Sequence, residues 1–226
     1  MILVENMTKR FGNHVLFDGF NMEILDGDFW VITGESGCGK TTLLNILGGI
    51  EPVNDGNVTC DSKVISSPEK MPKNFQGLRN YYKIRKNQLE YYKYTVGFLF
   101  QNFALVEAKT VRQNLELVQK AARTDIDFET ALASVGMQDK LDCPVYTLSG
   151  GEQQRIALAR LMVKKCNIIL ADEPTGSLDK ANAKSVIDIL RSMNQNGKTV
   201  CIVTHDESIG DYATKSLHLE RKKDVL

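Results

Sequence analysis

The chain has 226 residues, a length that fits a single domain with a substantial buried core. Its 28 Lys and Arg residues balance 28 Asp and Glu residues, and this neutrality argues against a dedicated nucleic-acid-binding protein, which usually carries a basic excess. No apolar run approaches the roughly 20 residues that cross a bilayer, and the first segment lacks the basic start and apolar run of a secretion signal, so we expect a cytosolic protein.

Short runs of β-branched and aromatic residues alternate with longer helical patterns, which is typical of an α/β protein with a largely parallel sheet. The early segments HVLFDGFNMEI and GNVTCDSKVI alternate or carry turn residues, and they predict an antiparallel strand layer beside that sheet. The other predicted strands are 29–33, 95–100, 167–171, 199–203 and 216–219. The predicted helices are 40–47, 111–122, 128–135, 151–163 and 180–194.

Residues 34–42, with the sequence GESGCGKTT, follow a predicted strand and open a predicted helix, as a P-loop does. The glycines allow backbone N–H groups to turn toward phosphate oxygens, and the helix N-terminus adds a favourable field. We expect Lys40 to reach the β- and γ-phosphates of a nucleotide and the Thr41 hydroxyl to bind Mg²⁺. The alternative interpretation of these residues is a glycine turn that caps a helix and binds no phosphate.

Two carboxylates end the predicted strand in the sequence NIILADE. After a P-loop this is a Walker B pattern, in which Asp172 holds the Mg²⁺ shell and Glu173 polarises the attacking water. The predicted strand 199–203 is followed by His205. A lone histidine is more often structural, but one at the carboxyl end of a strand beside a nucleotide site is a candidate for catalysis.

A second phosphate cradle is predicted where the helix 151–163 begins. The Ser149 hydroxyl and the first backbone amides of the helix, at Gly150, Gly151 and Glu152, can together bind a phosphate. Because the P-loop already holds the nucleotide phosphates from one side, the second cradle is predicted to serve the nucleotide of another copy of the chain. Two copies would then face each other head to tail, and each would supply half of both sites.

The segment LSGGEQ at residues 148–153 matches the signature motif of the ABC ATPases, the nucleotide-binding subunits of ATP-binding-cassette transporters, which the chain resembles essentially end to end. Phe11 matches the aromatic position, usually a tyrosine, that stacks on adenine in that family. Gln101 matches the Q-loop glutamine, which senses Mg²⁺ and water and meets the membrane partner. Residues 176–179, Gly-Ser-Leu-Asp, match the D-loop along the dimer interface, and His205 matches the histidine that contacts the γ-phosphate.

The resemblance implies an α/β fold of the P-loop NTPase type: a RecA-like core with a mostly parallel sheet, an antiparallel β layer and a helical subdomain. It implies one ABC ATPase domain over residues 1–226. Within it we expect the ATP-binding core at approximately 1–100 and 149–226, the helical subdomain at approximately 101–148, and a basic, tyrosine-rich insertion at approximately 62–94.

The ligands implied are ATP and Mg²⁺, and the site residues fall into three groups. The residues expected to bind nucleotide are Phe11, Gly34, Glu35, Ser36, Gly37, Cys38, Gly39, Lys40, Thr41, Thr42, Ser149, Gly150, Gly151, Glu152 and Asp179. The residues expected to bind Mg²⁺ are Thr41, Gln101 and Asp172. The residues expected in catalysis are Glu173, His205, Gln101 and Lys40. Ser149 and Gly151 are expected to act in trans, in a homodimer formed through the nucleotide sites.

The resemblance also implies an integral membrane permease as partner and a place on the inner face of the cell membrane. Finer matches in FLFQNFALVEAKTVRQNLEL and ADEPTGSLD resemble the subgroup that serves macrolide exporters, lipoprotein-release systems, bacteriocin exporters and the cell-division permease. We therefore expect export of a peptide, a lipoprotein or a hydrophobic drug. The alternative is a non-transporting signalling complex that activates an enzyme outside the cell through its permease.

Five scattered cysteines, with no Cys-x-x-Cys pair, predict reduced thiols and exclude a disulfide framework or a zinc site of the usual spacing. Cys38 stands where the family commonly has serine, beside a helix N-terminus and Lys40, which favours the thiolate. The simpler interpretation is a small apolar filler. The alternative is oxidative inactivation against which ATP protects.

Residues 62–94 are longer than the family usually carries before the Q-loop, and they hold eight Lys or Arg residues and two Glu residues. Leu78, Tyr81, Tyr82, Leu89 and Tyr92 fall at roughly helical spacing and predict the apolar stripe of an extra helix. The simpler interpretation is a solvated helix packed on the body of the subunit. The alternative is a basic, aromatic face that meets the permease or anionic lipid headgroups.

Overall fold

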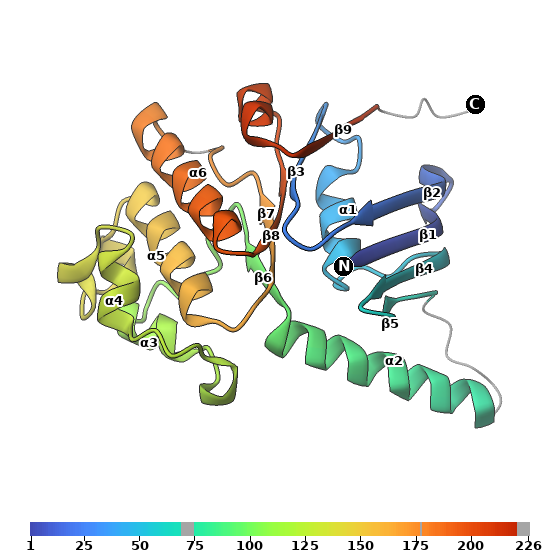
Figure 1. Cartoon of the computed structure of the whole chain (residues 1–226), viewed down its shortest axis with the longest axis horizontal. Coiled ribbons are helices and arrows are strands. Elements are labelled where there is room, and N and C mark those ends of the chain that lie inside the picture. The colour runs from blue at the N-terminus through green and yellow to red at the C-terminus, as the bar shows by residue number, and fades with distance from the viewer. Residues whose placement is uncertain (69–74, 177, 221–226) are drawn as a thin grey trace.

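The computed structural model describes residues 1–68, 75–176 and 178–220, which form two β-sheets with helices between and beside them (Figure 1). The larger sheet has five parallel strands in the order β6-β7-β8-β3-β9. Their bounds are Val96–Leu99 (β6), Ile168–Asp172 (β7), Thr199–Val203 (β8), Phe29–Gly34 (β3) and Lys215–Leu219 (β9). The predicted parallel sheet is confirmed, and each predicted strand differs from the observed one by at most one residue at either end.

The smaller sheet is antiparallel and has the order β2-β1-β4-β5. Its strands are Ile2–Phe11 (β1), His14–Ile24 (β2), Asp55–Cys60 (β4) and Lys63–Ser66 (β5). This confirms the antiparallel layer that the early segments predict. The layer is solvated on one side, so its strands alternate between buried and exposed residues, as β4 and the first part of β1 show.

The parallel sheet is covered on both faces, because alternate residues of its strands enter two different cores. On β7, Ile169 and Ala171 pack in the core beside α5 (Gly150–Val163) and α6 (Lys180–Gln195). Ile168 and Leu170 pack in the other core with α1 (Lys40–Leu47), which lies between the two sheets (Figure 1). The P-loop helix α1 and the signature helix α5 therefore lie on opposite faces of the sheet.

The segment between β6 and α5 forms short helices that pack against α5 at one end of the molecule (Figure 1). They are α3 (Val111–Glu116), α4 (Phe128–Ala133) and 3-10 turns at Lys120–Ala122, Gln138–Lys140 and Val145–Thr147, and a further 3-10 turn lies at Glu207–Tyr212. The single helix predicted over 111–122 is wrong. The Arg123 guanidinium donates to the carbonyls of Glu116 at 3.1 Å and Val118 at 2.7 Å, so it occupies carbonyls that a continuing helix would use.

A long helix, α2 (Phe75–Tyr94), runs from the antiparallel sheet to β6 (Figure 1). Residues 75–94 of the predicted insertion form a helix that contacts the body, whereas the predicted apolar stripe is wrong: Tyr82 and Leu89 are 64% and 60% exposed, and the buried tyrosine is Tyr91. The Tyr91 hydroxyl donates to the carbonyl of Leu47 at 3.0 Å, which fixes the helix on the end of α1. Residues 69–74 of the predicted insertion lie outside the described residues.

The five cysteines are all unpaired thiols, as predicted. Burial raises the pKa of Cys60 and of Cys201 to about 12, so neither thiol ionises at neutral pH. Across the described ranges, none of the helices combines the length and the apolar character that spanning a bilayer requires.

Candidate active site

A cavity of about 540 Å³ opens where the carboxyl ends of the parallel strands meet the N-terminus of α1. This edge is where nucleotides bind in open α/β sheets. The residues that line it are Phe11, His14, Leu16, Ser36, Gly37, Gly39, Lys40, Thr41, Thr42, Gln101, Glu173, Gly176 and His205. Ten of these thirteen are predicted site residues, so the fold brings together segments that are far apart in the sequence.

The P-loop joins β3 to α1 and has a conformation that depends on glycine. Gly39 has a φ of 101°, and a Cβ there would lie 3.1 Å from the ring of Phe17. A Cβ on Gly34 would lie 2.3 Å from the carbonyl oxygen of Leu219, which is too close for any side chain. The loop backbone is therefore held against β9 and the antiparallel sheet, and glycine is required at both ends.

The N-terminus of α1 is open to a phosphate. Side chains cap α3, α4, α5 and α6, whose N-caps are Thr110, Asp127, Ser149 and Asp179. The N-cap of α1 is Gly39, which makes no side-chain hydrogen bond. The first amides of α1 therefore face the cavity without a side-chain acceptor, and this arrangement fits an anionic phosphate group.

Lys40 is buried at the first position of α1 and reaches back over the P-loop. Its ammonium donates to the carbonyls of Gly34 at 2.7 Å and Glu35 at 3.0 Å. The charge is thus fixed at the edge of the cavity, within reach of a phosphate that the loop amides would hold.

Thr41 and Asp172 bring two oxygen ligands together from α1 and β7. The Thr41 hydroxyl donates to Asp172 Oδ1 at 3.1 Å. Burial raises the pKa of Asp172, while the hydrogen bond from Thr41 opposes that rise. Two protein oxygens beside a phosphate cradle suit Mg²⁺, which keeps waters and phosphate oxygens as its other ligands. The residues present therefore fit the predicted metal.

Glu173 follows β7 in a strained backbone conformation, with a φ of 44°. Its Oε2 lies 2.9 Å from His205 Nδ1 and accepts a hydrogen bond of 3.1 Å from the Thr204 hydroxyl. This backbone conformation accompanies a carboxylate that points toward the end of β8. Glu173 itself follows β7, and its partners Thr204 and His205 follow β8. Thr204 is fully buried and was not among the predicted site residues, although it precedes His205 in the sequence.

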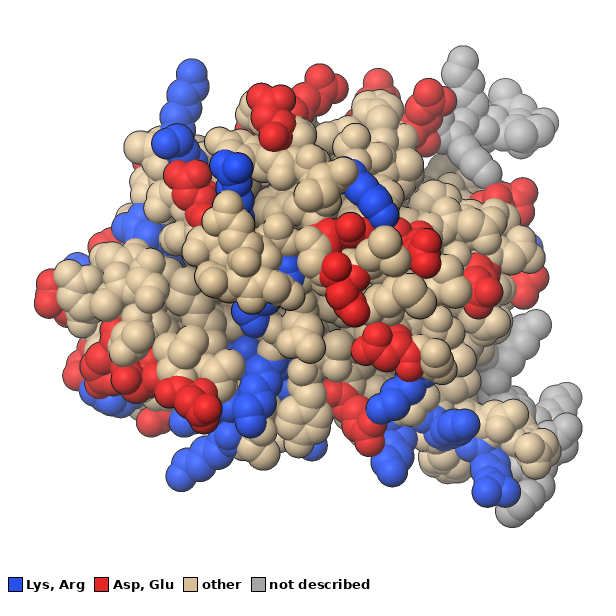
Figure 2. Space-filling view, in the orientation of Figure 1, with Lys and Arg blue, Asp and Glu red and all other residues tan. Residues whose placement is uncertain are grey.

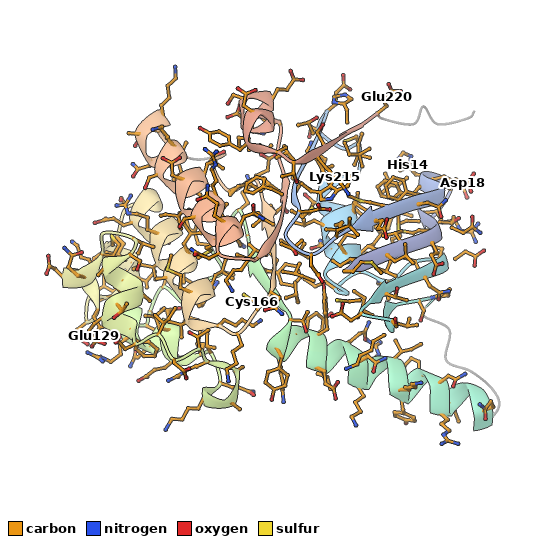
Figure 3. The ribbon with its side chains drawn as sticks, in the orientation of Figure 1. His14, Asp18, Glu129, Cys166, Lys215 and Glu220 are labelled. Carbon is orange, nitrogen blue, oxygen red and sulfur yellow. The ribbon has the colours of Figure 1, made fainter. Side chains whose placement is uncertain are left out.

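Phe11 and Gln101 lie at the rim of the cavity. The Phe11 ring is half exposed, and the ammonium of Lys9 lies 4.6 Å from its centroid. The prediction missed His14, which projects from β2 and pairs with Phe11 across the β1–β2 hairpin (Figure 3). It also missed Leu16 on the same strand, and it assigned Gly176 to the D-loop rather than to the cavity lining. The alternation of β2 was the signal for the first two, since residues 14 and 16 share a face.

The signature segment does not line this cavity. Ser149 caps α5 in a capping box: the Glu152 amide donates to the Ser149 hydroxyl at 3.3 Å, and Glu152 Oε2 accepts from the Ser149 amide at 2.8 Å. These bonds, with the Ser149 hydroxyl, hold the pKa of Glu152 below its ordinary value. Ser149 and Gly150 are exposed. The predicted second cradle is therefore a solvent-exposed helix N-terminus that its own Ser149 caps, and it lies away from the P-loop.

Asp179 also lies outside the cavity, and it is joined to the signature helix through Asn182. Asp179 caps α6 and accepts from the side-chain amide of Asn182 at 2.6 Å, while the Arg155 guanidinium donates to Asn182 Oδ1 at 2.5 Å. The buried Gln154 donates to the carbonyl of Pro174 at 2.7 Å, directly after Glu173. These contacts, which the sequence did not predict, fix α5 to the segment that follows β7. Ser177 of the predicted D-loop lies outside the described residues.

Cys38 is only 3% exposed and packs in the core around α1. A Cβ on Gly34 would lie 2.8 Å from its sulfur, so the thiol fills the inside of the P-loop. This placement supports the simpler interpretation of Cys38 as a small apolar filler.

Comparisons with known proteins agree with this geometry. A family model described as "ABC transporter" matches residues 17–176. The lipoprotein-releasing system ATP-binding protein LolD of Aquifex aeolicus is 33% identical over 100% of this chain and 96% of that protein. The macrolide export ATP-binding/permease protein MacB of Campylobacter fetus is 34% identical over 97% of this chain but 33% of its own length.

A solved structure of an ATP-binding cassette, dimeric and bound to ADP and Pi in a post-hydrolysis state, has the same fold. It matches with a TM-score of 0.79 and 27% identity, over 99% of this chain and 97% of that one. The predicted resemblance to the macrolide-export and lipoprotein-release subgroup is thereby confirmed. The chain belongs to the ABC transporter family, as an ATP-binding subunit that hydrolyses ATP.

Proposed function

We propose that two copies of this chain close head to tail on two molecules of Mg·ATP, hydrolyse them and separate again, and that this cycle drives an integral membrane permease. One observation carries the proposal. The cavity gathers residues for binding and hydrolysis from six segments of one chain, yet the exposed start of the signature cradle, Ser149 and Gly150, lies at another place on the same chain. A second copy is the simplest source of the missing half of each site.

In the proposed site, the P-loop amides, Lys40 and the N-terminus of α1 hold the phosphates. The phosphate contacts extend over Gly34, Glu35, Ser36, Gly37, Cys38, Gly39 and Thr42. Phe11 packs on the adenine ring from the rim of the cavity, where its side chain is half exposed. Thr41 and Asp172, with Gln101, hold the Mg²⁺ ion. That ion would neutralise charge on the transferred phosphoryl group.

Glu173 is proposed to orient and polarise the attacking water. Its carboxylate is already fixed by Thr204 and His205, so little reorganisation is needed when a water binds. His205 and Gln101 line the same cavity and would position the water and the γ-phosphate from either side. Catalysis would rest on positioning and charge stabilisation rather than on a covalent intermediate.

The partner copy would supply Ser149, Gly150 and Gly151, with Glu152 keeping Ser149 in place as the helix cap. Asp179 would lie at the same interface, because its hydrogen bond to Asn182 connects it to the signature helix. Gln154 of α5 contacts Pro174, the residue after Glu173. Binding of the other copy's nucleotide phosphate at the start of α5 would therefore affect the position of Glu173 in the same chain.

A second cavity, of about 350 Å³, supports a permease docking site next to Gln101. Its apolar lining includes Phe98 in β6, Phe100 directly after that strand, and Leu117 after α3. A short helix of a permease would fit such a groove and would sense movement of the adjoining Q-loop. The subunit would then lie on the inner face of the membrane and drive export of a peptide, a lipoprotein or a hydrophobic drug. The names of two relatives, for macrolide export and lipoprotein release, support the last two substrate classes.

The concentration dependence of ATPase activity tests this proposal. For the purified chain, the activity per molecule should rise with protein concentration, because only dimers hydrolyse ATP, and Lys40→Ala should abolish it at every concentration. Activity per molecule that stays constant as the protein is diluted to the nanomolar range would refute the shared site.

A further inference from the structure

The helix α2 presents two different sides, and only one of them is used by the fold. Its inner side is bonded to the body: the Gln88 amide donates to the carbonyl of Ile65 at 2.8 Å, the Asn87 amide to that of Val64 at 3.3 Å, and the Tyr92 hydroxyl to that of Gly49. With the Tyr91 bond to α1, these contacts fix the rotation of the helix about its own axis. The opposite side is therefore permanently turned outward.

The outward side carries a stripe of residues at spacings of three and four. The stripe consists of Arg79, Tyr82, Lys86, Leu89 and Lys93, all of them exposed, and Lys83 lies beside it. Tyr82 and Leu89 are among the most exposed large apolar side chains of the described residues. We refer to these six residues as the outer face of α2. It combines cations with two bulky, exposed side chains, of which Tyr82 makes an edge-on contact with the ring of Tyr81, 5.9 Å between centroids.

The charge of the outer face is not balanced by the subunit itself. Within residues 1–68, 75–176 and 178–220, no acidic side chain forms an ion pair with Arg79, Lys83, Lys86 or Lys93. Glu90 is the acidic residue of α2, and it pairs with Lys63 at 3.2 Å. Figure 2 shows blue side chains gathered over α2, although the whole chain is neutral. The basic excess is thus a local feature of this face.

The position of the helix indicates what the face meets. Tyr92 and Lys93, at the end of α2, line the same groove as Phe98, Phe100 and Leu117. If the permease docks in that groove, as proposed above, α2 extends from the docking site along the side of the subunit that faces the membrane. From Arg79 to Lys93 the stripe is about 21 Å long, at a rise of about 1.5 Å per residue.

We infer that the outer face of α2 binds anionic phospholipid headgroups beside the permease. The four cations would contact lipid phosphates, while Tyr82 and Leu89 enter the boundary between headgroups and acyl chains, where tyrosine is favoured. A row of cations with no acidic residue suits a membrane surface, because lipid headgroups present phosphate groups along its whole extent. A protein partner would instead need acidic groups spaced along the whole stripe. The inference rests on the proposed function for the orientation of the subunit.

Vesicle flotation with the full chain tests the inference. Wild-type protein should float with vesicles of phosphatidylcholine and phosphatidylglycerol, but not with phosphatidylcholine alone, and salt should weaken the binding. Arg79→Glu, Lys83→Glu and Lys86→Glu together should weaken binding at least tenfold, since each such cation is worth a factor of roughly five near an anionic surface.

A matched control makes the same change of charge elsewhere. Lys165→Glu, Lys184→Glu and Arg191→Glu alter two lysines and one arginine that are also exposed but lie near α5 and α6. The control should bind vesicles like wild type, and thermal unfolding should show that both triple variants fold. Equal binding of the two triple variants, or no binding of wild type to anionic vesicles, would overturn the inference.

The failure of this inference and of the proposed function can be told apart. ATPase activity without vesicles depends on the shared nucleotide site and should be the same in wild type and both triple variants. Capture of the permease in detergent, where no bilayer is present, should also be unaffected. If the α2 variant loses permease capture in detergent, the face docks protein and the lipid assignment is wrong, while the ATPase proposal stands.

Discussion

Glu173 and Thr204 directly follow the neighbouring strands β7 and β8, and the Thr204 hydroxyl donates a hydrogen bond of 3.1 Å to Glu173 Oε2. With His205 Nδ1 at 2.9 Å, this bond aims a carboxylate whose backbone is itself strained. The pair shows how the end of β8 prepares the residue that is proposed to polarise water. It also makes a residue outside the cavity lining relevant to turnover.

Thr204→Val should therefore lower ATPase turnover by about tenfold, because a hydrogen bond to a charged group is lost at constant side-chain shape. ATP affinity should stay unchanged, since Thr204 does not line the cavity. Steady-state kinetics with nucleotide-binding measurements separate the two effects. Thr204→Ser keeps the hydroxyl and serves as the control; if both variants lose turnover equally, the hydrogen bond is not the cause.

Glu173→Gln should lower turnover by about 10²–10⁴-fold while Mg·ATP still binds, because the amide cannot polarise the water. The bound nucleotide would then keep the dimer closed. Gel filtration with light scattering in Mg·ATP should show a dimer for the variant and a monomer without nucleotide. A monomer at saturating Mg·ATP would count against the closed dimer.

The signature cap predicts a pH effect on stability. The Ser149 amide and hydroxyl lower the pKa of Glu152 from its ordinary value of 4.5. A carboxylate with a lowered pKa stabilises the fold above its unfolded pKa, and this stabilisation is lost as the pH falls through the folded pKa. Glu152→Gln keeps a cap acceptor but not the charge, so it should be less stable than wild type by about 0.5–1 kcal/mol at pH 7.

Urea unfolding at several pH values measures this difference. The gap between wild type and Glu152→Gln should narrow as the pH falls below 4.5. Parallel stability curves over that range would show that the charge of Glu152 does not contribute.

Cys38 should not make the enzyme sensitive to oxidation, because its thiol is buried inside the P-loop. Peroxide treatment should reduce the ATPase activity of wild type and Cys38→Ser at the same rate, with or without ATP. Faster loss in wild type, slowed by bound ATP, would instead support the redox hypothesis.

The strands and most helices could be predicted because their patterns are local: four of the five residues of β8 are β-branched, and α1 directly follows the P-loop. The end of α3 at Glu116 could not be predicted, because it depends on the guanidinium of Arg123, seven residues further along the chain. The burial of Tyr91 rather than Tyr82 depends on the end of α1, a partner that the periodicity of α2 alone does not reveal.

The same distinction holds for the site. The P-loop, Asp172 and Glu173 are recognisable because their chemistry lies in short contiguous segments. Thr204 and His14 act through pairing between strands, and Gln154 acts through the carbonyl of Pro174 on another element. Such contacts arise from the packing of distant segments, which the sequence of one chain does not display.

Mixing two inactive variants measures the shared site most directly. Lys40→Ala disables the P-loop, while Gly150→Glu places a carboxylate in the signature cradle, where the new Cβ has room because the nearest atom, in the Phe103 ring, is 3.8 Å away. A carboxylate in the first turn also suits the helix dipole, so the variant should fold.

Each variant alone should be nearly inactive. In a mixed dimer one site carries both defects and the other carries none, so an equal mixture should recover about a quarter of wild-type ATPase activity if the sites act independently. A mixture no more active than the sum of its two components would contradict the account, because each chain would then complete its own site.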